Sequence, residues 1–441
     1  MKWELATDEK MTAVIRSGVE YATPDWAHSV HVEPEGLEPA RHYWYRFTVG
    51  GTRSAVGRTR TAPSPGATTA RLRLGVACCQ HYEHGYFTAY RHMLDDDLDL
   101  IVHVGDYIYE SSFGENLVRS HGAPEPYTLD DYRIRYSLYK GDPDLAAAHE
   151  QYPWLMTWDD HEVDNDYAGQ VSEENDDVEW FLARRAAAYR AYYEHMPLPR
   201  RAVPFGALMR LYTQRAFGDL ASIYMLDQRQ YRSPEACPLP GRRGGNRVSQ
   251  CAELFDASRT MLGPRQEEWL SAALTQSRAR WNLLAQGTFM AYLDEDPGPG
   301  QSYWTDAWNG YPAARERLLK TLVARHVANP VVLSGDIHAF AVNRLNIEPA
   351  KPESAIVASE LVTTSVSTRG VPAKMAEGWA SANPDILLMN SQLRGYLRVD
   401  LTRQRLQADL VALDSEKTLK SKARIFRSFV IEDGRPGPVP L

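Results

Sequence analysis

The sequence predicts an α/β core preceded by a small N-terminal antiparallel β-sandwich domain, and three observations support this. Short alternating stretches fill the first 62 positions, apolar runs alternate with helical patterns after about residue 71, and a proline-containing segment separates the two regions. With 441 residues, of which 44% are hydrophobic and 24% charged, the chain has ample apolar material for a large core. A tiny disulfide-stapled scaffold and a globally disordered chain are therefore excluded.

The N-terminal region alternates apolar and polar residues with the period of half-buried strands, most clearly at 11–15, 29–32 and 42–49. Residues 63–70 then bring in prolines and small residues, which cannot sustain a strand ladder. We therefore expect a β-sandwich domain over 1–62, a linker over 63–70 and the main domain over 71–441.

The main domain contains six apolar runs typical of buried strands, at 72–79, 98–106, 152–160, 221–227, 281–290 and 329–338. Between them, residues 177–195 place Phe181, Ala188 and Tyr192 on one stripe of a predicted helix. A second helix is predicted over 264–278, with a proline in its first turn and with Trp269, Leu270, Ala273 and Leu274 on its buried face.

Three of these strands end in polar residues that bind hard cations. The run 98–106 ends in Gly105 and Asp106, the run 152–160 leads into DDHE at 159–162, and the run 329–338 ends in GDIH at 335–338. Open α/β sheets bind ligands at the carboxyl ends of their strands. A single aspartate there is more often a helix cap, but three such motifs in one chain predict a split polynuclear metal site.

The charge balance excludes two classes of partner. Lys and Arg number 49 against 57 Asp and Glu, a net charge of −8, which argues against a surface that attracts nucleic acid or anionic lipid.

No window of 18 apolar residues predicts a transmembrane helix, and the start MKWELATDEK has no apolar signal region. The chain as given thus carries no recognisable export signal, and its oligomeric state is not predicted.

The cysteines bear on the compartment. Cys237 and Cys251 flank a loop rich in Pro, Gly and Arg, and we expect a disulfide to close it, two free thiols being the alternative. Such a bond persists in an oxidising compartment.

Several motifs resemble, in order and spacing, the alkaline phosphatase D (PhoD-like) family. The resemblance implies a four-layer αββα metallophosphoesterase sandwich and an active site that holds Fe3+ and Ca2+, with two calcium ions expected. The motifs are GVACCQ (75–80), GYFTAYRHM (85–93), LDLIVHVGDYIYE (98–110), MTWDDHEVDNDY (156–167) and LSGDIHAF (333–340), with further agreement at YYEHMPLP, LDQRQYR, RTMLGPRQEEWL, NGYPAARERLL and SELVTTS.

Carried over residue by residue, the resemblance implies an iron site with Cys79 as thiolate ligand, Asp106 as bridging carboxylate, Tyr109 as phenolate and His338 as imidazole ligand. This mixture of soft and nitrogen donors suits ferric iron better than magnesium.

For calcium, which prefers oxygen donors, the resemblance implies Asp160 and Asp336 as ligands. Related enzymes carry Asn and His, respectively, at these places. Asp164 and Asn165 are candidates for a further calcium, with a polar turn as the equally good alternative.

The chain departs from the family pattern at two places. Cys78 occupies a position where the family has a small residue, and neighbouring strand residues face opposite ways. We assign Cys79 to the metal and Cys78 to the core, an assignment that a bulge at the strand end would reverse. Related proteins also carry an export signal and a further strand before WELATD, so the fibronectin-III-like sandwich is expected to lack its first strand.

His161 is expected to contact a phosphoryl oxygen or the leaving group, and the alternative is that it orients Asp160. His92 and His195 fall in predicted helices and are expected to be structural.

The predicted activity is hydrolysis of phosphate monoesters or diesters by a metal-activated hydroxide, without a phosphorylated protein intermediate. The alternatives are phospholipase D-like or teichoic-acid-type phosphodiesterase activity and, outside enzymes, a calcium-stabilised surface protein. The family resemblance, the calcium and the cysteine loop favour a secreted or cell-envelope location over the cytoplasm.

Overall fold

The computed structural model describes residues 1–296, 300–349, 351 and 353–441. Its N-terminal strands form one five-stranded antiparallel sheet, in which β3 pairs with β1, β4 and β5 while β2 lies outside β1. The strands are β1 (Lys2–Ala6), β2 (Val14–Val19), β3 (His42–Val49), β4 (Thr52–Arg53) and β5 (Gly57–Arg60).

Two of the three strands expected in this region are found. The strand predicted over 42–49 is confirmed with the same bounds, and the one predicted over 11–15 begins later, at Val14. The prediction for 29–32 is wrong, because this segment lies against the main domain instead of joining the sheet. His31 donates from Nδ1 to the carbonyl oxygen of Leu198 at 2.8 Å and stacks on Tyr193, with ring centroids 4.1 Å apart.

The main domain is built on two seven-stranded sheets packed face to face. One has the order β21-β20-β19-β18-β6-β7-β8 and the other the order β17-β15-β16-β14-β12-β10-β9. Strands β6, β7 and β8 run parallel to one another, as do β10, β12, β14 and β16. Their carboxyl ends therefore meet at one edge of the sandwich.

The strands of the first sheet are β6 (Arg71–Ala77), β7 (Leu100–His103), β8 (Trp154–Met156), β18 (Gly395–Thr402), β19 (Arg405–Leu413), β20 (Ala423–Glu432) and β21 (Arg435–Pro440). Those of the second are β9 (Thr213–Phe217), β10 (Ala221–Met225), β12 (Trp281–Ala285), β14 (Pro330–Ser334), β15 (Phe340–Asn346), β16 (Ile356–Val362) and β17 (Ile386–Asn390).

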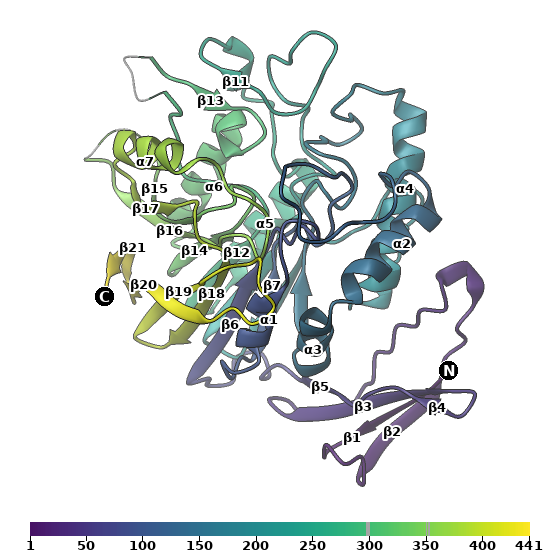
Figure 1. The fold of residues 1–441 in the computed structure, drawn as a ribbon. Helices are drawn as coiled ribbons and strands as arrows, with labels where there is room; N and C mark the ends of the chain where they lie inside the picture. The colour runs from purple at the N-terminus through teal and green to yellow at the C-terminus, as the bar shows by residue number, and fades with distance from the viewer. Residues whose placement is uncertain (297–299, 350, 352) are drawn as a thin grey trace.

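Helices cover both outer faces, which completes the four-layer sandwich that the family resemblance implies (Figure 1). Helices α1 (Thr88–Met93), α2 (Leu129–Lys140), α3 (Pro143–Gln151) and α4 (Val178–His195) pack on the first sheet. Helices α5 (Pro264–Gln276), α6 (Pro312–Ala324) and α7 (Ala373–Ala382) pack on the second. Short 3-10 helices lie at η1 (Pro24–Trp26), η2 (Arg200–Ala202), η3 (Ala252–Phe255) and η4 (Trp308–Gly310).

All six buried strands that the sequence predicts are present, as β6, β7, β8, β10, β12 and β14, but each is shorter than predicted. The polar residues at their carboxyl ends leave the sheet. Asp106 and Asp336, for instance, have φ angles of 57° and 64°, in a left-handed region that cannot continue a strand.

The two helices predicted from sequence are α4 and α5. The side chain of Asp177 caps α4 by accepting from the backbone N–H groups of Glu179 and Trp180, and Pro264 begins α5. Of the residues expected to be buried on α5, Leu270 and Leu274 are buried, whereas Trp269 and Ala273 are only partly so.

The segment 63–70 contains no strand and is tied to the main domain through Asp219. The Asp219 carboxylate accepts from the backbone N–H of Thr69 at 3.0 Å, and its own N–H donates to the carbonyl of Ala67 at 2.9 Å. The division of the chain at this segment stays a prediction.

Cys237 and Cys251 are bonded in the structure, with their Cα atoms 6.2 Å apart. The loop between them is paired with another segment of the chain, because β11 (Arg247–Val248) within it pairs with β13 (Tyr303–Trp304).

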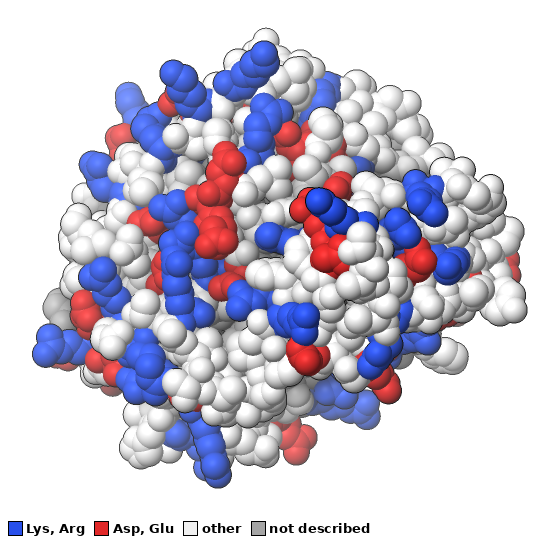
Figure 2. All heavy atoms as spheres, turned by 90° about the horizontal axis from the view of Figure 1, so that it is seen from below, with Lys and Arg blue, Asp and Glu red and all other residues white. Residues whose placement is uncertain are grey.

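The molecular surface carries mixed charge on the face seen from below, where basic and acidic side chains lie beside one another with uncharged surface between them (Figure 2). None of the described helices has the length and apolar character that crossing a membrane requires.

Candidate metal centre

The polar residues predicted from sequence as ligands follow parallel strands of both sheets. Cys79 comes two residues after β6, Asp106 three after β7, Asp160 four after β8 and Asp336 two after β14. The edge where these strands end therefore gathers side chains that are as many as 257 residues apart in the sequence, the separation of Cys79 and Asp336 (336 − 79).

Glycines let the loops approach one another closely at this edge. Gly105 has a φ of 117°, and a Cβ there would lie 2.6 Å from the Cβ of Asp159. A Cβ on Gly335 would lie 2.6 Å from the Sγ atom of Cys78. Both positions therefore require glycine, as expected for a glycine beside a ligand.

One group of metal-ligand atoms consists of Cys79, Asp106 and His338, whose donor atoms lie within 4.8 Å of one another. Tyr109 joins them: its hydroxyl donates to Asp106 Oδ2 at 2.9 Å and lies 3.1 Å from Nε2 of His338. The Nε2 atom of His338 therefore faces the group, and the backbone of Arg369 lies within hydrogen-bonding reach of the same ring. Four predicted residues therefore converge on one point.

The backbone around this group is strained. Cys79, Asp106, Asp336 and His338 all have positive φ angles, of 53°, 57°, 64° and 53°. Non-glycine residues adopt this conformation rarely, and such strain concentrates at functional sites. The Sγ atom of Cys78 faces the carbonyls of Thr363 and Thr364 at 3.8 Å and also lies within hydrogen-bonding reach of the Cys79 side chain.

A second group consists of Asp106, Asp160 and His161, again with donor atoms within 4.8 Å of one another. Since Asp106 belongs to both groups, its carboxylate lies between two potential cation positions. The His161 ring lies 4.1 Å from that of Tyr109, and its Nδ1 lies 2.8 Å from Oε2 of the buried Glu110.

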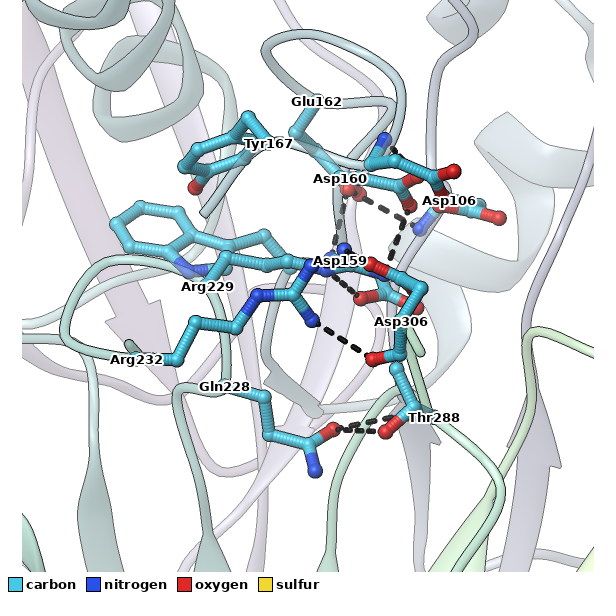
Figure 3. Close-up of polar contacts among 12 residues, drawn as sticks. Asp106, Asp159, Asp160, Glu162, Tyr167, Gln228, Arg229, Arg232, Thr288 and Asp306 are labelled. Carbon is cyan, nitrogen blue, oxygen red and sulfur yellow. Dashed lines mark hydrogen bonds and ion pairs between the residues drawn. The ribbon is translucent and has the colours of Figure 1, made fainter. Parts of the chain in front are cut away.

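Arg229 holds the carboxylates behind the second group (Figure 3). Its Nε donates to Asp159 at 2.5 Å, and its two Nη atoms donate to Asp306 at 2.6 and 2.9 Å. It also lies 3.4 Å from Oδ1 of Asp160, whose other oxygen accepts from the N–H of Asp166 at 2.7 Å. All of the Arg229 side chain is buried, so this ion-pair network is shielded from water.

The charges of the centre fit bound cations. Burial, and after it the charge of Cys79, raises the pKa of Asp106 well above its usual value, and burial raises the pKa of the Cys79 thiol. Asp106 Oδ1 is buried without a hydrogen-bond partner, and Asp160 Oδ1 has no hydrogen bond but only the Arg229 guanidinium at 3.4 Å. A buried carboxylate oxygen with no donor is costly, and a cation would satisfy it.

Burial raises the pKa of the Asp160 carboxyl. The charges of Arg229 and His161 outweigh this effect and hold that pKa below its usual value. His161 shows the reverse balance, since burial lowers its pKa while Glu110, Asp160 and Asp106 raise it well above the usual value. Burial lowers the pKa of His338 to about 3, so this imidazole is neutral and can donate a lone pair.

Asp336 belongs to neither of the two groups that contain Asp106. Burial raises its pKa well above the usual value, and Asp159, Asp306 and Asp160 raise it further, which places it in the same field of carboxylates.

Asp164 and Asn165, the candidates for a further calcium, are placed differently. The Asp164 carboxylate pairs with Arg184 at 2.8 Å, and the backbone N–H of Asn165 donates to Glu110 at 3.1 Å. The structure brings neither side chain into the ligand groups found among the described residues.

The other histidines predicted to be structural have structural contacts. His92 bonds the carbonyl of Ser421 through Nε2 at 2.8 Å, and the ring of His195 stacks on Tyr136.

Sequence reasoning missed several residues that shape the centre: Arg229, Asp306, Asp166, Glu110 and Glu162. Glu162 accepts from the N–H groups of Asp106, Tyr107 and Asp159 at 3.1, 2.7 and 2.9 Å, and so fixes two strand-end loops. The available signal for Arg229 was its place in LDQRQYR directly after an apolar run. Asp306 lies in no strand or helix, and no pattern marked it.

Comparisons with known proteins point to one family. Residues 74–410 match the sequence model of a family described as PhoD-like phosphatase, and residues 1–63 match the N-terminal domain of PhoD-like phosphatase. The chain is 44% identical over 417 residues to alkaline phosphatase D of Bacillus subtilis strain 168, which covers 93% of this chain and 70% of the relative. A solved structure titled "Structure of PhoD" matches with a TM-score of 0.94 at 41% identity, covering 100% of this chain and 84% of the other.

Proposed function

The chain belongs to the PhoD-like phosphatase family, and we propose that its metal-dependent hydrolysis of phosphate esters takes place at the centre built around Asp106. The chain is an enzyme, so the alternative of a calcium-stabilised surface protein falls away. The proposal concerns which cations and which residues carry the reaction.

We assign Fe3+ to Cys79, Asp106, Tyr109 and His338, and two Ca2+ ions to the oxygen donors beside them. The observation that carries this is the convergence of a thiol, a phenol and an imidazole around the carboxylate of Asp106, which also belongs to a second, oxygen-rich group. Thiolate and imidazole suit a transition metal, whereas carboxylates suit calcium.

For calcium, Asp160 and Asp336 are the proposed ligands together with Asp106. Asp166 extends this set, because its backbone N–H donates to Asp160 and burial, Asp306 and Asp160 raise the pKa of its carboxyl well above the usual value. Asp164 and Asn165 remain candidates for a further calcium only if their loop rearranges.

When bound, the cations lower the pKa of water and balance the negative charge of the transferring phosphoryl group. The side chains of the protein hold the reacting and ligand groups in place. Glu110 holds Nδ1 of His161, so Nε2 is the nitrogen left to contact a phosphoryl or leaving-group oxygen. Arg229 fixes Asp159 and Asp306 and lies against Asp160, and Glu162 fixes the loop that carries Asp106.

The activity test compares p-nitrophenyl phosphate with bis-p-nitrophenyl phosphate after metal analysis of the purified protein. Faster release from the monoester identifies a phosphomonoesterase. Faster release from the diester favours the phosphodiesterase alternatives, including cleavage of phospholipid head groups and teichoic-acid-type polymers. A protein that carries only calcium and hydrolyses neither compound would contradict the proposal.

The assignment of iron predicts colour. The purified enzyme should show a charge-transfer band from thiolate and phenolate to ferric ion, because both ligands are oxidisable. Cys79→Ala should remove the thiolate component, and Tyr109→Phe should shift the remainder, as measured by absorption spectroscopy.

Cys78→Ala is the matched control, because its sulfur packs near Gly335 and faces backbone carbonyls. It should leave the band unchanged. Iron-free, colourless protein with full activity would contradict the assignment of iron. Loss of iron in Cys78→Ala but not in Cys79→Ala would show that Cys78, and not Cys79, is the thiolate ligand.

We also propose that the enzyme works outside the cytoplasm, in the cell envelope or secreted. The bonded pair Cys237 and Cys251 supports this, as does the proposed calcium, since extracellular calcium modules work with dissociation constants of roughly 10⁻⁴ to 10⁻³ M.

The double variant Cys237→Ser/Cys251→Ser should lose stability, by about 3 kcal/mol for a loop of this size. Thermal unfolding with and without reductant measures this. Intact-mass spectrometry of protein recovered from the cell surface or medium should show two hydrogens fewer than the reduced chain, and two free thiols there would refute the disulfide.

A further inference from the structure

Arg369 lies beside the metal centre, yet its charge takes no part in it. The preceding residue, Thr368, places its hydroxyl 3.0 Å from that of Tyr109 and 2.7 Å from the carbonyl of Cys79. The carbonyl of Arg369 itself bonds the ring of His338. Thr368, which directly precedes Arg369, thus contacts both Tyr109 and Cys79. These contacts fix the backbone of Arg369 beside the proposed ligands.

The side chain of Arg369 extends across Gly114, which has a φ of 85°. A Cβ on Gly114 would lie 2.7 Å from an Nη atom of Arg369 and 3.3 Å from Nε2 of His84. His84 ties the two segments together, because its Nδ1 accepts from the N–H of Arg369 at 3.3 Å and its Nε2 donates to the carbonyl of Phe113 at 2.9 Å. The guanidinium is held over the Gly114 backbone.

No carboxylate of the described residues forms an ion pair with Arg369. The charges around it are mixed: Glu83 and Lys417 both act on the same His84 ring, and Arg394 donates to the carbonyls of Thr368 and His338 at 2.7 and 2.9 Å. Arg369 is therefore a guanidinium without a carboxylate partner of its own, in contrast to Arg229, whose charge is matched by Asp159 and Asp306.

Phe113 supplies an apolar wall next to this charge. Its side chain is 40% exposed, and its ring makes edge contacts with those of His84 and His81 and lies 6.1 Å from that of Tyr109. Phe113 thus lies near both the Tyr109 ring of the ligand group and the His84 ring that bonds the backbone of Arg369.

We propose that Arg369 forms a subsite for a second negatively charged group of the substrate, a carboxylate or a phosphate, distinct from the phosphoryl group being transferred. The inference rests on the proposed location of the reaction at Asp106. It makes the enzyme selective for phosphate esters whose leaving group is itself anionic.

The test is calorimetric binding of two non-hydrolysable compounds to the metal-loaded enzyme, propylphosphonate and 2-carboxyethylphosphonate, which differ in the second anionic group. The wild-type enzyme should bind the carboxylated compound about tenfold or more tightly, as expected for one charge-assisted hydrogen bond. Arg369→Met should abolish this difference while leaving propylphosphonate affinity unchanged, and Arg369→Lys should restore part of it.

Arg325→Met is the matched control, because Arg325 is exposed at the end of α6 and forms no ion pair among the described residues. It should change neither affinity. Equal binding of both compounds by the wild type, or an equal loss for both in Arg369→Met, would overturn the subsite. Hydrolysis of p-nitrophenyl phosphate and its diester is measured separately, so failure of the proposed function would appear there as inactivity of the metal-loaded wild type.

Discussion

Asp106→Asn is expected to lower kcat/KM at least about 10³-fold, the upper range for removal of one preorganised electrostatic contact. Asp106 is the residue shared by both ligand groups, so the change weakens two cation positions at once. Asparagine tolerates the φ of 57° found here, and its amide oxygen can still accept from Tyr109. The fold should therefore survive, and the loss should appear in p-nitrophenyl phosphate or diester kinetics together with reduced iron and calcium content.

Asp160→Asn is the matched comparison. Asp160 belongs to one ligand group, and asparagine keeps an oxygen that can bind calcium. We expect partial activity and unchanged iron content. Near-complete activity in both variants would contradict a centre that shares one carboxylate between cations.

Arg229→Met is expected to destabilise the protein by about 3–5 kcal/mol, because it leaves the buried carboxylates of Asp159 and Asp306 without their counter-charge. It should also reduce activity, since Asp160 loses the guanidinium at 3.4 Å that keeps its carboxyl ionised. Thermal unfolding of metal-free and metal-loaded protein measures the first effect, and kcat/KM the second.

Two control variants separate the effect of the buried Arg229 ion-pair network from the effect of losing an exposed ion pair. Arg229→Lys keeps the charge but loses the paired hydrogen bonds to Asp306, so it should be intermediate. Arg403→Met breaks a pair with Asp219 in which both side chains are partly exposed, and should change the thermal unfolding temperature little. If Arg229→Met were as stable as Arg403→Met, Arg229 would not be the central cation of the network.

The sequence was sufficient for the parts of the fold that depend on local pattern. The run at 98–106 predicted β7 because Leu100 and Val102 face the inter-sheet core while Ile101 packs under the helices, so these three consecutive positions are all apolar. The segment 29–32 has the same local pattern as a strand but packs on Tyr193, more than 160 residues away. Nothing local distinguishes the two outcomes.

The candidate site likewise contains some residues that the sequence predicted and others that it did not. Asp106, Asp160 and His338 lie at strand ends, where parallel topology brings them together, so motif position was enough to predict that they lie close to one another. Cys79 was selected through the family resemblance and not through its position in a strand. Arg229 and Asp306 act through an ion pair that spans 77 residues, and Asp306 lies in an irregular segment. Their roles depend on how loops from different strands pack, which single-sequence periodicity does not encode.

The central claim is that one iron ion lies between Cys79, Asp106, Tyr109 and His338, beside calcium held by carboxylates. Anomalous diffraction from crystals of the active enzyme, recorded on either side of the iron absorption edge, tests it most directly. The account predicts a single strong iron peak within bonding distance of the Cys79 sulfur and the Tyr109 oxygen, with calcium density next to Asp106 and Asp160. Fully active crystals with no iron signal at these residues, or with iron bound elsewhere in the molecule, would contradict it.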